Sequence, residues 1–153
     1  MEASIVTVII GVGVTAMLQL LAAGTVANSE GTELTTAINL ANNVREISLG
    51  LAYRDPQTPT QWSTKESSVT AYDDVIDLNG CAFSPPLDAR RLPITDYSNW
   101  SQNVVVQTVA EDQVNSTRPN STASPTARVA VTITHNSRQV YQTSWLAVAP
   151  NED

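Results

Sequence analysis

The sequence has one cysteine, one phenylalanine and one histidine in 153 residues. Because Cys81 has no second cysteine, an internal disulfide is impossible, and we expect a buried thiol, with pairing between two chains as the alternative. His135 is the only histidine and falls in a segment expected to turn, which argues against a Ser-His-Asp triad. The sequence also lacks a glycine-rich phosphate loop and a cysteine cluster for zinc. We therefore expect no enzyme and no organic cofactor.

Basic residues are few. Eight Lys and Arg stand against fifteen Asp and Glu, so the net charge is -7 and the isoelectric point is near 4.5. Nucleic-acid binding needs a basic face, and this balance argues against such a partner. The length suits one small domain together with one membrane or filament helix.

Charge is absent from a long N-terminal run, because no charged residue lies between Glu2 and Glu30. A helix rises about 1.5 Å per residue, so this run can cross the ~30 Å hydrocarbon core of a bilayer. We expect an apolar transmembrane or filament-core helix over residues 1–27. A cleaved secretory signal is the weaker interpretation, because such signals begin with positive charge and carry a shorter apolar run. An ordinary single-pass anchor is the stronger rival.

The next segment has apolar residues at spacings of three and four. They are Leu34, Ile38, Ala41, Val44, Ile47 and Leu51. This spacing predicts an amphipathic continuation of the helix over residues 28–53. We expect the helix to continue through the small polar stretch Asn28–Gly31, with a bend at Gly31. Asp55-Pro56 predicts its end, because the residue before proline avoids helical backbone angles.

The remainder, residues 54–153, reads as a globular head. Residues 54–99 are rich in polar residues and proline and predict a connecting loop. Residues 100–110, 127–134 and 139–148 are rich in Val and Thr, and Val129, Val131 and Ile133 alternate, which predicts antiparallel strands over about 100–148. The fold class is therefore α+β, with a long helix packed on a small antiparallel sheet.

The N-terminal residues Glu2-Ala-Ser-Ile-Val-Thr-Val-Ile-Ile-Gly-Val-Gly resemble the start of type IV pilins and pseudopilins. In that family a glutamate precedes a uniformly apolar helix, whose amphipathic half packs on a C-terminal sheet. The glutamate usually stands fifth in the mature chain, whereas here it is second. We expect either that a leader and about three mature residues precede this sequence or that the true start differs.

The resemblance implies roles for three residues. Glu2 would pair with the α-amino group of a neighbouring chain, since a carboxylate beside hydrocarbon is costly unless it is paired; a solvated Glu2 at the membrane interface is the alternative. Gly11 and Gly13 would let helices approach closely or would weaken the helix, and we expect local melting between Gly11 and Gln19.

A second likeness lies in the connecting segment. The run Tyr72-Asp73-Asp74-Val75-Ile76-Asp77-Leu78-Asn79-Gly80, followed by Ser84-Pro85-Pro86, is similar to minor pilin-like proteins of the mannose-sensitive haemagglutinin type. Ile76 and Leu78 depart from the acidic and aromatic positions of that pattern.

The same run offers oxygen ligands of the kind that Ca²⁺ takes. The candidates are Asp73, Asp74, Asp77 and Asn79. The spacing does not match an EF-hand loop, and some pseudopilins hold Ca²⁺ in connecting loops. The alternative is structural: Asp73 and Asp74 cap a turn or short helix, and Asn79-Gly80 makes a tight turn.

Three sequons, at Asn99, Asn115 and Asn120, are candidates for N-glycosylation. Ser/Thr/Asn-rich loops also produce sequons by chance.

The resemblance implies a structural subunit of an extracellular type IV pilus-like filament, or fimbrium, on a bacterial surface. Its expected partners are copies of itself, the pilus or secretion assembly machinery with its prepilin peptidase, and the inner membrane before assembly. One alternative is a minor pilin or pseudopilin of a type II secretion-like apparatus. The other is a non-polymerising, membrane-anchored binding domain.

Overall fold

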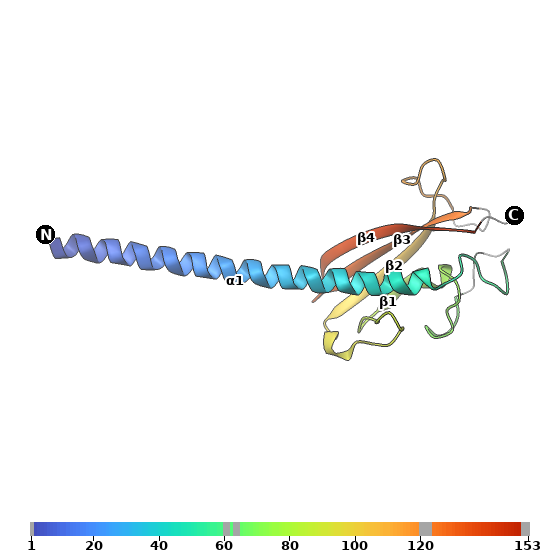
Figure 1. Ribbon diagram of the computed structural model, residues 1–153, viewed down its shortest axis with the longest axis horizontal. Coiled ribbons are helices and arrows are strands. Elements are labelled where there is room, and N and C mark those ends of the chain that lie inside the picture. Colours follow the sequence, from blue (N-terminus) through green and yellow to red (C-terminus); the bar gives the residue numbers. More distant parts are fainter. Residues whose placement is uncertain (1, 60–61, 63–64, 120–123, 151–153) are drawn as a thin grey trace. The chain divides into compact units, whose positions relative to one another are not determined.

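The computed structural model describes residues 2–59, 62, 65–119 and 124–150, with side chains described from residue 10 onward. Its helices and strands are α1 (Glu2–Leu49), η1 (Ile76–Leu78), β1 (Cys81–Phe83), η2 (Thr95–Tyr97), β2 (Trp100–Thr108), β3 (Thr126–His135) and β4 (Arg138–Val148) (Figure 1). One long helix and a four-stranded antiparallel sheet confirm the predicted α+β class. Two compact units divide the chain, Met1–Thr36 and Ala37–Asp153.

The part of α1 in the first unit is helical without interruption. The expected melting between Gly11 and Gln19 is therefore absent from the single chain, whereas the expected continuation of the helix through Asn28–Gly31 is confirmed. Every backbone group between the ends of a helix has an intrahelical partner, so an isolated helix gains nothing by opening there.

The part of α1 in the second unit packs on the sheet through one stripe. This stripe consists of Ala37, Leu40, Ala41, Val44 and Ile47, each at most 3% exposed. The prediction was right for the last three and wrong for Leu34 and Ile38, which are 43% and 36% exposed. The predicted and the observed residues both follow helical spacing. The core begins only at Ala37, so the buried stripe includes Ala37 and Leu40 in place of Leu34 and Ile38.

The sheet is a meander in the order β1-β2-β3-β4, with each neighbouring pair antiparallel. Alternate side chains of β2 and β3 are buried, among them Val104 and Val131, which lie opposite each other. The predicted inward face of Val129, Val131 and Ile133 is confirmed, because all three are fully buried. This face and the α1 stripe form the hydrophobic core.

The β3–β4 hairpin turns at Asn136 and Ser137, which have φ of 49° and 64°. Two successive positive φ values are typical of the two-residue turn that matches strand twist. His135, expected in the turn, is instead the last residue of β3. Its ring stacks on Trp100, with centroids 4.3 Å apart and planes 8° from parallel.

The segment expected to be a connecting loop, residues 54–99, contains η1, β1 and η2. Strand β1 pairs with β2, with Cys81 opposite Val104. A three-residue strand is too short to show an alternating pattern, so β1 could not be predicted from periodicity. The Cys81 thiol is buried, as expected, and donates to the carbonyl oxygen of Asp77 at 3.2 Å.

Candidate functional site

The apolar run of α1 is exposed along its whole described length. Its large apolar side chains are between 51% and 75% exposed: Ile10, Val12, Val14, Met17, Leu18, Leu20, Leu21 and Val26. Within Ile10–Leu49 the helix is long and apolar enough to cross a membrane. Removing apolar surface from water stabilises a protein by about 25 cal/mol per Å². Lipid or other apolar helices around this stretch would therefore stabilise it.

Thr15 and Thr25, whose side chains lie in the described part of this run, satisfy their hydroxyl groups within the helix. Thr15 Oγ1 donates to the carbonyl oxygens of Gly11 and Val12, each at 2.9 Å, and Thr25 Oγ1 donates to that of Ala22 at 2.8 Å. A hydroxyl satisfied in this way enters an apolar surrounding at little cost. The surface between residues 10 and 27 is therefore compatible with lipid.

Of the three predicted assembly residues, Gly11 and Gly13 lie entirely within the described part of the structure. A Cβ built on Gly11 or Gly13 would meet nothing within 4 Å, so neither glycine is needed for packing among the described residues. Because no described residue lies beside either glycine, the space next to each one is open to another molecule. Glu2 begins α1, and its side chain lies outside the described part of the structure.

Two of the four predicted calcium ligands, Asp74 and Asn79, accept main-chain hydrogen bonds through a side-chain oxygen. Asp74 is fully buried, and its Oδ1 accepts hydrogen bonds from the main-chain N–H groups of Ile76 (2.6 Å) and Asp77 (3.2 Å) at the start of η1. Asn79 Oδ1 accepts from the N–H of Val106 at 3.0 Å and so ties the loop to β2. Asp74 Oδ1 and Asn79 Oδ1 thus hold the loop in shape.

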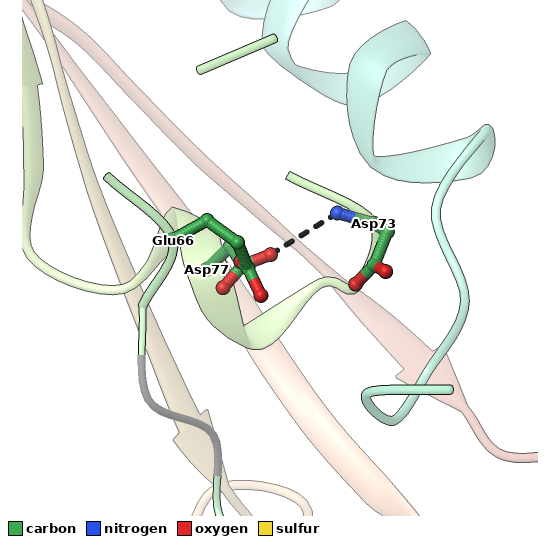
Figure 2. A group of neighbouring side chains, drawn as sticks. All are labelled: Glu66, Asp73 and Asp77. Atoms are coloured by element: carbon green, nitrogen blue, oxygen red, sulfur yellow. Dashed lines mark hydrogen bonds between the residues drawn. The ribbon is translucent and has the colours of Figure 1, made fainter. Parts of the chain in front are cut away.

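The other two aspartates meet a third carboxylate, Glu66, which the sequence analysis did not single out. One side-chain oxygen each of Glu66, Asp73 and Asp77 lies within 4.8 Å of the others. Figure 2 shows the three side chains around η1, with Asp77 Oδ2 accepting from the Asp73 N–H at 3.2 Å. Glu66 lies in a polar stretch whose pattern carries no signal of such a contact.

Crowding of carboxylates shifts their proton affinity. Hydrogen bonding with Asp77, together with burial, raises the pKa of Glu66 to about 7. Burial and the charge of Asp77 raise the pKa of Asp74 to about 6. Among the described residues, Glu66 Oε2, Asp73 Oδ1 and Asp74 Oδ2 are buried without a hydrogen-bond partner. The cluster can therefore take up a proton near neutral pH, and its oxygen ligands are of the type that suits Ca²⁺.

Two of the three sequons are described, and both asparagines are exposed. Asn99 precedes β2, and Asn115 lies in the loop between β2 and β3. Asn120 lies outside the described residues.

Comparison of the chain with protein-family models, with curated proteins and with solved structures finds no match.

Proposed function

We propose that this chain is a structural subunit of an extracellular type IV pilus-like filament. The observation that carries the proposal is the division of α1 at Ala37. Before it, the described apolar side chains are exposed; after it, a stripe of the same helix is buried on an antiparallel sheet. A subunit whose helices bundle needs one segment free for its neighbours and another that anchors its own head.

Packing between helices supplies the free energy of assembly. Lipid tails are as apolar as leucine, so moving the helix from the inner membrane into a bundle gains close packing and polar pairing more than hydrophobic transfer. Gly11 and Gly13 offer the small surface that close packing needs. Glu2 pairs with the α-amino group of a neighbouring chain and sets the axial position of each subunit.

The head faces outward and is held in the filament by α1. Its chemistry suits solvent, since residues 111–119 are exposed throughout and include Asn115. The inner membrane holds the subunit before assembly, and prepilin peptidase and the pilus machinery are its partners there.

The test compares Glu2→Gln with Glu46→Gln, which removes a carboxylate from an exposed position of α1 in the second unit. Both variants are expected to accumulate in the membrane. We expect the Glu46 variant to form surface filaments and the Glu2 variant to lose them. Equal filament yields from both would show that the chain polymerises without the Glu2 carboxylate and would overturn the pairing role proposed for Glu2. Absence of filaments even in the unchanged protein would favour the membrane-anchored binding domain or a minor pseudopilin.

A further inference from the structure

Strand β4 is an edge of the sheet, and most of its length is open to a further strand. Its eleven residues, Arg138–Val148, pair with β3 on one side, and no strand of the described chain pairs with the other side. The opposite edge of the sheet is β1, which is only three residues long. An open edge leaves main-chain donors and acceptors without partners, so β4 offers far more of them than β1.

Only the start of β4 carries the usual protections of an edge strand. These are the charge of Arg138 and a bulge at Val140, which has no partner in β3. From Tyr141 to Val148 the ladder with β3 is regular, and this stretch contains neither a charged residue nor a proline. An edge of this length and composition is able to take up another strand.

Helix α1 does not fully cover the inner face of this stretch. The inward-facing residues of β3, such as Val131, are fully buried. Their partners in β4 are Tyr141, Thr143 and Trp145, which are only partly buried. Because alternate residues of a strand point to one face, a strand added to β4 would place side chains beside these three residues and complete the cover.

A groove of about 250 Å³ lies between this stretch and α1. Its helix wall consists of Ala41, Asn42 and Arg45, and Trp145 is among the residues of β4 that line it. Trp145 Nε1 donates to Ser48 Oγ at 3.1 Å, which ties the strand to the helix at this point. A strand added to β4 points every second side chain toward the helix, and the groove leaves space for them.

The helix face beside this groove is basic at its centre and apolar on either side. Ile38, Arg45 and Leu49 share one face of α1, because their spacings of seven and four are close to two turns and one turn. Ile38 and Leu49 are 36% and 67% exposed. Arg45 is exposed, and among the described residues no carboxylate pairs with it or lines the groove. In a chain of net charge -7 this is a basic spot, and a carboxylate with apolar neighbours complements it.

We propose that Tyr141–Val148 binds an extended, acidic segment of a partner protein as a fifth strand of the sheet. Main-chain groups of the segment pair with the open edge. A carboxylate that faces the helix meets Arg45, and an apolar residue two positions along the segment lies beside Leu49. The spacings agree, because four helical residues rise about 6 Å and alternate strand residues lie about 6.6 Å apart. The contact goes beyond the proposed filament and uses residues of the second unit alone.

A labelled peptide tests the charge contact in the full chain dispersed in detergent micelles. The probe is Thr-Val-Thr-Glu-Thr-Val-Thr with blocked ends, whose side chains follow the same order in both directions, and its binding is measured by fluorescence anisotropy. We expect Arg45→Glu to weaken binding at least tenfold. A probe with lysine in place of glutamate should bind the Arg45→Glu variant at least tenfold more tightly than it binds the unchanged chain.

Arg118→Glu is the matched control, because Arg118 is exposed in the loop between β2 and β3 and the substitution changes the net charge equally. It should alter the binding of either probe by less than about twofold. Equal losses in the two variants would overturn the proposal, and so would the absence of binding at a probe concentration of about 1 mM.

N-methylation of the probe tests whether it adds as a strand. The main-chain N–H groups of successive residues in a strand point to opposite edges. Methylating the valine and glutamate nitrogens therefore blocks one edge of the probe, and methylating the inner threonine nitrogens blocks the other. We expect one of the two methylated probes to lose at least tenfold in affinity and the other to keep its affinity within about threefold. Equal affinities would show that the probe does not pair with β4 and would contradict the proposal.

A second copy of the chain is the competing occupant of this edge. If copies paired there, the affinity for the probe would fall as the chain concentration rises, and dimers would accumulate in analytical ultracentrifugation. That result would overturn the proposal. Glu2→Gln should leave the binding of the probe unchanged, so failure of this contact and failure of the proposed filament are distinguishable.

Discussion

The side-chain amide of Gln102 donates a hydrogen bond to the main-chain carbonyl oxygen of Leu40, at 2.9 Å. Gln102 is the third residue of β2 and is fully buried. The same amide nitrogen donates to the carbonyl oxygen of Leu87 at 3.1 Å, and its oxygen accepts from the Leu87 N–H at 2.7 Å. One polar side chain therefore joins helix α1, the sheet and the segment that leads to η2.

Replacement of Gln102 by leucine should destabilise the head. The change leaves the Leu87 N–H, a buried donor, without its partner, and such losses cost about 1–3 kcal/mol each. We expect the free energy of unfolding to fall by about 2–4 kcal/mol, measured by urea denaturation followed by tryptophan fluorescence. Gln107→Leu, at an exposed position of the same strand, should change it by less than about 0.5 kcal/mol. Equal losses in the two variants would refute this role.

The burial of Gln102 could not be predicted from the sequence. Period-two patterning correctly placed Val129, Val131 and Ile133 on the inner face, because burial of apolar side chains follows the pleat. The same pattern gives no reason to place an amide there, since its partners lie 62 and 15 residues away. Leu34 was wrongly predicted to be buried. Helical spacing identifies the apolar face of a helix but does not show how far along the helix the sheet extends.

One of the candidate sites could be predicted from the sequence, and the other could not. The long uncharged run and its exposure could be predicted from composition alone. Glu66 could not be connected with Asp73 and Asp77, because an irregular loop brings them together and loops carry no periodic signal.

Lowering the pH from 7.5 to 5 should stabilise the head. The folded pKa values of Glu66 and Asp74, about 7 and about 6, lie above their ordinary values of 4.5 and 3.8. In this range the folded state binds protons that the unfolded state does not, so acidification favours folding. Below about pH 4 the trend should reverse, because hydrogen bonds hold the pKa values of Asp55 and Asp88 below their usual range.

Thermal unfolding measured at several pH values tests this behaviour. Glu66→Gln removes one of the two groups and should reduce the gain in Tm between pH 7.5 and 5 without abolishing it. A Tm that falls steadily on acidification from pH 7.5 would show that the carboxylate cluster does not hold protons as described.

Gly80 should resist substitution for conformational reasons only. Its φ is +69°, and a Cβ there would meet no atom within 4 Å. Gly80→Ala should therefore cost about 1–2 kcal/mol of unfolding free energy through backbone strain. Gly80→Asn should cost less, because asparagine tolerates left-handed angles. Chemical denaturation compares the two, and a larger loss with asparagine would point to a steric clash instead of strain.

Substitution of Gly13 by isoleucine should leave the isolated subunit intact. Nothing lies within 4 Å of its Cβ position, so the Tm of the head in detergent is expected to stay unchanged. In the proposed filament, the larger side chain separates helices that pack through small residues, and filament yield should fall severalfold. Val12→Ile, at an exposed neighbouring position, is the matched control. Normal filament yield from the Gly13 variant would exclude this glycine from the helix contact.

The most direct test of the central claim is electron microscopy of material sheared from the producing cells, with mass spectrometry of the intact subunit from the same material. We expect helical filaments composed mainly of this chain, and the mass defines the mature N-terminus, any methylation and any glycan. Recovery of the chain from the membrane fraction alone, with no filament in the sheared material, would refute the proposed filament subunit.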